Sequence, residues 1–330
     1  MNWLITGGCG FIGRALIRQL RERGEHHIRV YDNLTVGTRD DLRGETAYSE
    51  VSDLDSVSDW SGDVSLIVGD ILDPERVKAA ASGADVIVHL AANTGVAPSV
   101  DDPMADCKAN VIGSLNVLEA CRYNNVGRLV FASSGAPLGV QTPPLHEEMA
   151  PHPASPYGAS KLAGEGYCSA YFHCYGVETV ILRFGNVYGE GSTRKASVVA
   201  KFIKQALVGE TLEIYGNGSQ TRDFIYVGDL VHAVFNAATL PGIGGEAFQI
   251  ATSAETTLGE LTELLVAAIK EVAGIEANYV NGQERNGDVA RNFSDTRKAR
   301  DKLHWEPKMP LKEGLRKTVQ FFLTQNNQTY

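Results

Sequence analysis

Two side chains that lie four residues apart, Tyr157 and Lys161 in the stretch YGASK, could together remove a proton from a hydroxyl group. On a helix this spacing places both side chains on one face. A free phenol has a pKa of about 10, too high for a general base at neutral pH. A neighbouring ammonium stabilises the phenolate and lowers that pKa. We therefore expect Tyr157, tuned by Lys161, to take a proton from an alcohol or sugar hydroxyl.

A hydroxyl that could assist this tyrosine comes from Ser133 or Ser134 in FASSGAPLG. Both serines end an apolar run, and a serine at such a strand end can hydrogen-bond the reacting oxygen and pass on a proton. The alternative is that they only cap the exit of the strand. Because YGASK follows this strand end closely, the serine strengthens the interpretation of Tyr157 and Lys161 as a catalytic pair.

The stretch TGGCGFIG predicts a site for a dinucleotide. Its glycines, Gly7, Gly10 and Gly13, follow a strand-like run and precede a helical pattern, which is the setting of the dinucleotide fingerprint. The N–H groups that begin such a helix attract phosphates. Asp32 ends the next run, 19 residues after Gly13, where a carboxylate binds the ribose diol and would repel a 2′-phosphate. Asn33 follows with no arginine beside it, so the prediction is NAD rather than NADP.

Two further runs end in residues that we expect at the same edge of the sheet, where ligands of such sheets bind. GDI ends the third run at residues 69–71, and HLAA ends the fourth at 89–92. Asp70 could accept a hydrogen bond from the adenine amino group, and Ile71 could offer backbone contacts. The alternative for Asp70 is an N-cap of the next helix.

These residues need a scaffold, and the pattern of apolar runs predicts one. Runs rich in Val, Ile and Leu with little alternation indicate parallel strands buried on both faces, and they lie at 3–6, 28–32, 65–70, 86–91, 128–134 and 179–184. Helical patterns between them cover 11–23, 74–82, 103–124 and 157–175. This alternation predicts an α/β fold with a doubly wound parallel sheet of the Rossmann type. The acidic stretch 44–63 is predicted to be a solvated connection with about one helical turn.

The parallel-strand signal weakens after about residue 185. We predict that residues 1–185 form a dinucleotide-binding domain that carries the catalytic residues. Residues 186–330 then form mainly a smaller C-terminal α/β substrate domain, with the chain crossing between the two more than once. The stretch GEGSTRK at 189–195 is predicted to be a mobile loop that closes over the substrate.

Composition argues against several classes of protein. The formal net charge of −10 disfavours general nucleic-acid binding. The sequence has no apolar run of the roughly 18 residues that a membrane span needs, and no signal peptide precedes the first strand. Five cysteines without a C-x-x-C pair favour reduced thiols in a cytoplasmic protein. The spacing of Cys168, His173 and Cys174 matches no usual zinc site, so no metal is predicted.

Taken together, the motifs resemble the extended short-chain dehydrogenase/reductase family, and within it the NAD-dependent nucleotide-sugar epimerases and dehydratases, above all the UDP-sugar 4-epimerases. The resemblance spans nearly the whole chain. It rests on TGGCGFIG, YDN, GDI, HLAA, Asn110, SS, YGASK, LRFGNVYG, TRDFIYVGDL and RNGD.

The resemblance implies a role for each matching position. The implied catalytic residues are Ser134, Tyr157 and Lys161. The implied NAD contacts are Gly7, Gly10, Phe11, Ile12, Gly13, Asp32, Asn33, Asp70, Ile71, Leu90, Ala91, Ala92, Asn110, Tyr157, Lys161 and Phe184. The implied UDP-sugar contacts are Ser134, Asn186, Val199, Tyr215, Arg222, Arg285 and Asp288. The structural alternatives are that Arg222 pairs with Asp223 or Asp229, and that Arg285 pairs with Glu284.

The reaction implied is inversion at C4 of a UDP-hexose through a transient 4-keto sugar, with the hydride held by NAD between its removal and return. A homodimer built on a four-helix bundle from residues 103–124 and 157–175 is also implied. UDP-glucose, UDP-galactose, their N-acetyl forms and UDP-glucuronate all remain open as substrates, as does dTDP in place of UDP. Arg194 or Lys195 would bind a C6 carboxylate, or else both lie in a solvated loop.

Two departures and two alternative functions bear on this implication. Dehydratases of the family place Asp–Glu directly after the catalytic serine or threonine, but here Gly135 and Ala136 stand there, which disfavours a 4,6-dehydratase. The family's usual VYG after the serines is replaced by PLG. A net nucleotide-sugar oxidoreductase is a second alternative to the epimerase. A non-catalytic NAD-binding protein is disfavoured by the intact serine, tyrosine and lysine.

Overall fold

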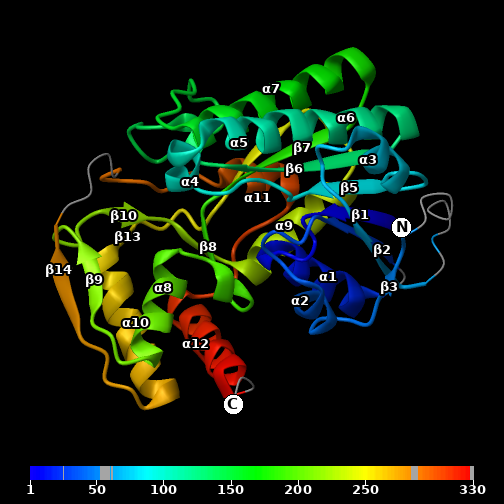
Figure 1. The fold of residues 1–330 in the computed structure, drawn as a ribbon. Coiled ribbons are helices and arrows are strands. Elements are labelled where there is room, and N and C mark those ends of the chain that lie inside the picture. Colours follow the sequence, from blue (N-terminus) through cyan, green and yellow to red (C-terminus); the bar gives the residue numbers. More distant parts are fainter. Residues whose placement is uncertain (25, 53–59, 61, 284–288, 328–330) are drawn as a thin grey trace.

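A computed structural model of the chain describes residues 1–24, 26–52, 60, 62–283 and 289–327. Within these residues the predicted doubly wound parallel sheet is confirmed, as Figure 1 shows. Its eight strands lie in the order β12-β7-β6-β5-β1-β2-β4-β3, and every adjacent pair runs parallel. The strands are β1 (Asn2–Thr6), β2 (His27–Asp32), β3 (Ser49–Glu50), β4 (Val64–Val68), β5 (Val86–His89), β6 (Arg128–Ser134), β7 (Thr179–Phe184) and β12 (Ala247–Ile250).

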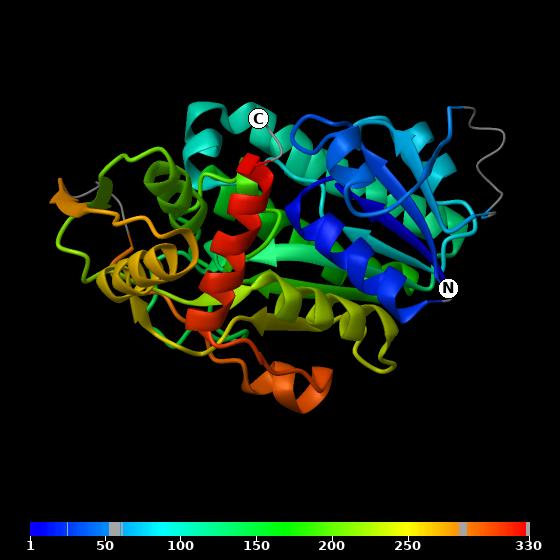
Figure 2. The same ribbon diagram turned by 90° about the horizontal axis from the view of Figure 1, so that it is seen from below.

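Helices cover both faces of this sheet, which is why its strands other than the edge strand β3 are mainly apolar. Consecutive residues of a strand point to opposite faces, and the neighbours Leu4 and Ile5 are both fully buried, each in a different apolar core. One core contains α3 (Pro74–Ala80), α6 (Gly113–Asn124) and α7 (Pro156–Tyr175). The other contains α1 (Phe11–Arg23), α9 (Val227–Thr239) and α11 (Arg297–Leu303), and Figure 2 shows α1 in blue and α9 in yellow-green across that face.

A smaller group of elements lies beyond the carboxyl ends of the strands and has its own apolar core, at the lower left of Figure 1. The short strands pair as β8 with β11, β9 with β14, and β10 with β13. Bounds for this group are β8 (Asn186–Tyr188), α8 (Val198–Leu207), β9 (Leu212–Tyr215), β10 (Thr221–Arg222), β11 (Phe224–Tyr226), β13 (Thr256–Thr257), α10 (Leu258–Ala273), β14 (Tyr279–Gly282) and α12 (Leu311–Asn327). Since α9, β12 and α11 follow residue 185 yet pack with the large sheet, the chain passes between the two groups repeatedly; the division at residue 185 stays a prediction.

Two segments differ from the predicted elements. The acidic stretch 44–63 contributes the edge strand β3, which pairs with β4, and a short helix, α2 (Arg39–Arg43), precedes the stretch. Residues 53–59 and 61 of the stretch lie outside the described residues, and the helical turn expected within it stays a prediction. The helix predicted over 103–124 is interrupted, because α5 (Pro103–Cys107) and α6 flank a π-helical turn at Lys108–Ile112. Asn110, inside this turn, bonds the backbone of Asn93 in both directions at 2.8 and 2.9 Å, and this attachment to another loop accompanies the wider turn. A short helix, α4 (Val96–Asp101), precedes α5.

Candidate active site

The glycine-rich turn after β1 forms a cradle at the point where the strand order reverses. β1 lies between β2 and β5, and such a switch point is where open α/β sheets bind ligands. Gly7 has φ +69°, and a Cβ there would lie 2.7 Å from the backbone nitrogen of Ala91. A Cβ on Gly13 would lie 2.5 Å from the Cα of Gly8. The helix α1 begins at Phe11 with no side chain capping its N–H groups, so these donors and the glycine cradle fit the diphosphate of NAD.

Gly13→Ala is expected to open this turn, because the added methyl group would collide with the backbone of Gly8. We expect the purified variant to retain much less NAD and to lose about 1–3 kcal/mol of unfolding free energy. NAD released by acid and thermal unfolding measure the two effects. Gly44→Ala is the matched control, since Gly44 has φ −65° and a Cβ there would meet atoms no closer than 3.5 Å. A Gly13→Ala protein with full NAD content would contradict the prediction.

The predicted ribose-binding carboxylate, Asp32, lies at the end of β2 beside the glycine turn. It is 7% exposed, and its two oxygens accept backbone N–H bonds from Cys9 at 2.9 Å and Leu34 at 2.8 Å. Burial raises the pKa of Asp32, and these two bonds lower it. A carboxylate has about four acceptor sites, so the fixed group keeps the capacity to accept from a ribose diol.

The predicted adenine contacts lie on the neighbouring strand ends. Asn33 donates from its amide to Asp70 at 3.0 Å, and the other oxygen of Asp70 accepts from the backbone of Leu72 at 2.9 Å. The N-cap of α3 is Asp73, so the alternative that Asp70 caps this helix is wrong. Ile71 is buried. At the end of β5, Leu90 and Ala91 donate their N–H groups to Thr6, and Ala92 follows them; Phe184 ends β7.

Asn110 was expected beside the cofactor, and the structure encloses it in protein. Its side chain is fully buried, and besides its bonds to Asn93 it donates to Asp106 at 2.9 Å and to Ser160 at 3.1 Å. Asn110 therefore joins the loop after β5 to α7. Its predicted contact with NAD stays a prediction.

The three predicted catalytic residues come together between β6 and α7. The side chain of Ser134 lies close enough to the phenol of Tyr157 to lower its pKa. Lys161 lies one turn further along α7, is 4% exposed, and donates from its ammonium to the carbonyl of Ala132 at 2.9 Å. Ser133 points elsewhere, because its hydroxyl donates to Glu165 at 2.5 Å. The structure thus brings Ser134, and not Ser133, to the tyrosine.

The pKa values of this group differ from the expectation. Burial raises the pKa of Tyr157 to about 12, the nearby side chain of Ser134 lowers it, and the charge of Asp106 raises it. Burial lowers the pKa of Lys161 to about 8. Burial thus outweighs Ser134 and leaves the pKa of Tyr157 raised, while the ammonium of Lys161 donates to a carbonyl. That Lys161 tunes Tyr157 stays a prediction. A further positive charge is needed near the phenol to make it a base at neutral pH.

A buried ion pair beneath these residues was not foreseen from the sequence. Arg183 of β7 binds both oxygens of Glu165 at 2.9 and 2.7 Å. Arg183, Glu165 and Ser133 form one cluster, and each is at most 6% exposed. The available signal was Glu165, which lies four residues after Lys161 and eight after Tyr157 on one face of α7. This cluster joins β6, β7 and α7 directly below the catalytic group.

The predicted substrate residues lie in the smaller group of elements and where it meets the sheet. Asn186 is exposed at the start of β8, whereas Val199 is 1% exposed within the core around α8. The ammonium of Lys201 lies 5.0 Å from the ring of Tyr215. Arg222 donates to the carbonyls of Thr221 and Val289. Arg285, Asp288 and Glu284 lie outside the described residues.

The structural alternatives for Arg222 are ion pairs with Asp223 or Asp229, and the hydrogen bonds of these two aspartates show what each carboxylate does in the fold. Asp223 accepts from the backbones of Thr252, Ser253 and Ser294. Asp229 accepts from the backbones of Lys308 and Met309. Both carboxylates thus hold loops together, and the diphosphate contact of Arg222 stays a prediction.

The predicted loop over the substrate, 189–195, contains a short 3₁₀ turn at Ser192–Arg194. Arg194 pairs with Asp41 at 2.9 Å, and Lys195 lies near the ring of Phe11. The loop is therefore attached to α1 and α2, although the side chain of Arg194 remains 51% exposed. A contact of either residue with the sugar stays a prediction.

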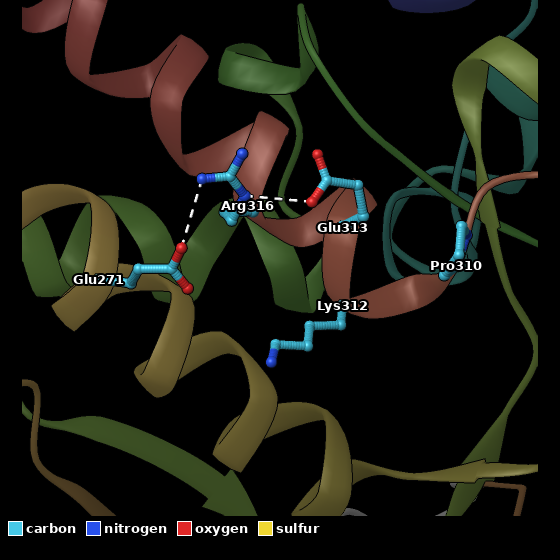
Figure 3. Close-up of a pocket in the computed structure, with 5 residues that line it drawn as sticks. All are labelled: Glu271, Pro310, Lys312, Glu313 and Arg316. Carbon is cyan, nitrogen blue, oxygen red and sulfur yellow. Dashed lines mark hydrogen bonds and ion pairs between the residues drawn. The ribbon is translucent and has the colours of Figure 1, made fainter.

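A hollow between α10 and α12 is separate from this site. Figure 3 shows it lined by Glu271, Pro310, Lys312, Glu313 and Arg316. Arg316 pairs with Glu271 at 3.3 Å and with Glu313 at 3.1 Å. None of the predicted site residues lines it, and its charges largely satisfy one another.

Comparisons with known proteins agree with this geometry. Residues 3–251 match the sequence model of the NAD dependent epimerase/dehydratase family. The UDP-glucose 4-epimerase of Mycolicibacterium smegmatis is 36% identical over 328 residues, which is 98% of each chain. A crystal structure of UDP-glucose 4-epimerase from Thermotoga maritima with UDP-glucose is 35% identical, with a TM-score of 0.86 over 99% of this chain and 100% of that one. UDP-glucuronic acid 4-epimerase from Bacillus cereus, in complex with UDP-glucuronic acid and NAD, is 26% identical with a TM-score of 0.86 over 100% of both chains.

Proposed function

Because the chain belongs to the NAD-dependent epimerase/dehydratase family, we propose that Ser134, Tyr157 and Lys161 invert C4 of a UDP-hexose, with NAD as the recycled cofactor. The enzyme is an NAD-dependent UDP-sugar 4-epimerase, an isomerase. The observation that carries the residue assignment is that Ser134, at the end of β6, lies near the phenol of Tyr157, one turn before the buried ammonium of Lys161 on α7.

The chain's own residues divide the work as follows. When bound, NAD⁺ supplies a hydride acceptor, its reduced form returns the hydride, and its ring carries the positive charge that favours a phenolate. Tyr157 takes the proton of the C4 hydroxyl and later returns it, while Ser134 bonds the same oxygen. Lys161 stays fixed by the Ala132 carbonyl, which holds its charge close to the tyrosine. The 4-keto sugar turns about its diphosphate link, so that hydrogen returns to the other face.

Room for this turn supports the epimerase over the dehydratase. Gly135 has an ordinary helical conformation, and a Cβ there would meet no atom within 4 Å. Ala136 donates its N–H to the hydroxyl oxygen of Ser134 at 3.2 Å. Gly135 and Ala136, rather than Asp and Glu, directly follow Ser134, so these two positions offer no proton donor for the departure of a C6 hydroxyl.

We take a neutral hexose, UDP-glucose or UDP-galactose, as the substrate. A C6 carboxylate needs a cation, and Arg194 is paired with Asp41 while Lys195 lies against the first helix. The similarity to UDP-glucose 4-epimerases supports the same choice. UDP-N-acetylhexoses, UDP-glucuronate and dTDP-glucose are the competing substrates.

Incubation with these nucleotide sugars, without added NAD, tests the function. The sugars released by acid are separated by chromatography, and absorbance at the NADH band is followed. We expect interconversion of UDP-glucose and UDP-galactose with no net NADH. Steady NADH formation would favour an oxidoreductase, and conversion of UDP-glucuronate alone would overturn the substrate choice.

Gly135→Leu is expected to slow epimerisation by about 10- to 100-fold, because the larger side chain would occupy space beside Ser134 and misplace the sugar. Thermal stability should change little, since a Cβ at this position meets no atom within 4 Å. Gly135→Ala, which adds one methyl group, is the control and should retain most activity. Equal kcat/KM for the leucine variant and the wild type would show that the sugar does not pass this position.

We further propose a homodimer through the surface of α4 to α7. Half of the exposed large apolar side chains of the described residues lie on these helices and their π-helical turn: Val96, Val100, Met104, Ile112, Tyr123, Tyr167 and Tyr175. An apolar surface of this kind on α-helices suits a helical bundle between two copies. Light scattering on the purified protein tests the proposal, and a monomer at micromolar concentration would contradict it.

The remaining proposals concern organisation and location. We propose that residues 1–185 mainly bind NAD and that residues 186–330 mainly bind the UDP-sugar.

All five cysteines are free thiols in the structure, which supports a cytoplasmic location, where UDP-hexoses would serve as polysaccharide precursors. Among the described residues, no helix is long and apolar enough to cross a membrane.

A further inference from the structure

The segment 189–195, which joins β8 to α8, lies against the helix that begins at the glycine turn. The carbonyl of Gly191 accepts from Arg14 of α1 at 2.8 Å. Arg194 donates to Asp41 at 2.9 Å, and Arg14 lies 3.8 Å from the same carboxylate. The bonds of Gly191 and Arg194 join residues more than 150 positions apart in sequence, and they hold the segment beside the start of α1.

Lys195, the last residue of this segment, places a cation at the start of α1. Its ammonium lies 5.3 Å from the ring centre of Phe11, the first residue of the helix. Both backbone groups of Lys195 are hydrogen-bonded: its N–H donates to the carbonyl of Ser192 at 2.9 Å, and its carbonyl accepts from the ammonium of Lys204 at 3.0 Å. The backbone that carries this side chain is therefore held in place by the fold.

The ammonium of Lys195 has no anionic partner among the described residues. The nearest carboxylates along the segment are engaged, Asp41 with Arg194 and Glu190 with the hydroxyl of Tyr226. Burial lowers the pKa of Lys195, and no carbonyl or carboxylate of the described chain accepts from it. Burying an ammonium without a counter-charge costs free energy, and an anionic ligand bound beside it would supply that charge.

We propose that Lys195 donates to the diphosphate of NAD, and that segment 189–195 thereby retains the cofactor. This inference rests on the NAD site of the proposed function. The free N–H groups of α1 and one ammonium would meet the diphosphate from two sides, and bonds between charged groups are stronger than neutral ones. A diphosphate also belongs to the UDP-sugar, but Phe11 directly follows the glycine turn, which favours the dinucleotide. A cofactor used and restored in each turnover benefits from such retention.

Lys195→Met tests the proposal, because methionine keeps most of the side chain and removes the charge. The NAD that co-purifies is released by acid and quantified, and NAD and UDP are each titrated calorimetrically into protein stripped of nucleotide. We expect NAD affinity to fall about 10- to 100-fold, with UDP affinity within twofold of wild type. Lys195→Arg should restore most of the NAD affinity, and Lys317→Met, on an exposed lysine of α12, should change neither.

Two results would overturn the proposal: unchanged NAD content and affinity in Lys195→Met, or a loss confined to UDP, which would assign the ammonium to the substrate diphosphate. Thermal unfolding of the stripped proteins checks that the variant is folded. Because binding is read without turnover, a wild type that binds NAD but fails to epimerise would sink the proposed function and leave this test intact.

Discussion

Tyr157→Phe is expected to lower kcat for UDP-hexose epimerisation by about 10²- to 10⁴-fold, the usual contribution of a positioned general base. The substitution removes only the hydroxyl that lies near Ser134. The ring keeps its volume, so the fold, the NAD content and UDP-sugar binding should persist. The loss should therefore appear in kcat and in kcat/KM alike, because the missing interaction acts in the transition state.

The measurement is initial rate against UDP-galactose concentration, with NAD content determined on the same samples. Tyr167→Phe is the matched control, since Tyr167 lies on the same helix and is 40% exposed. Ser134→Ala should also slow the reaction, and the double variant should cost less than the two losses combined, because both hydroxyls act on one oxygen. A Tyr157→Phe enzyme with near wild-type kcat would refute the assignment of the base.

Arg183→Met is expected to destabilise the protein by about 3–5 kcal/mol, the range found when one partner of a buried ion pair is removed. The change leaves the carboxylate of Glu165 buried with only the hydroxyl of Ser133 to bond it. Because Glu165 lies one turn below Lys161 on α7, we expect the catalytic group to lose its alignment as well. Urea unfolding gives the stability change, and NAD content reports the site.

The pair also allows a compensating change. Combining Arg183→Met with Glu165→Leu removes both charges and should recover much of the stability, since apolar replacements of buried ion pairs are often neutral. Lys270→Met is the control on an exposed pair with Glu276, for which we expect no measurable change. A double variant as unstable as Arg183→Met alone would mean that packing, rather than the unpaired charge, sets the cost.

The large sheet was predictable because both of its faces are buried. Each apolar run became a strand, and the carboxyl ends of those strands placed the glycine turn, Asp32 and Asp70 at one edge. The edge strand β3 could not be predicted in this way, because its two residues are exposed and carry no apolar signal. Its pairing depends on the neighbouring strand β4 instead.

The candidate site was predictable in its residue types and less so in its electrostatics. Spacing alone identified Tyr157 and Lys161, but it could not decide between Ser133 and Ser134, since adjacent residues of a strand face opposite sides. It also could not give the extent of burial that raises the pKa of Tyr157. The attachment of Arg194 to Asp41 joins residues 153 positions apart, and no local pattern encodes such a contact.

The path of the chain also bears on how the protein is made. When only the first 185 residues have left the ribosome, the sheet lacks the edge strand β12, and one of its faces lacks α9 and α11. The apolar residues of β7 and of the face that α9 covers then remain exposed to water until about 120 more residues have been synthesised. The large sheet and its helical cover can therefore be completed only after the C-terminal third of the chain has been synthesised. Until then, chaperones or fast synthesis and folding must protect the exposed apolar residues from aggregation.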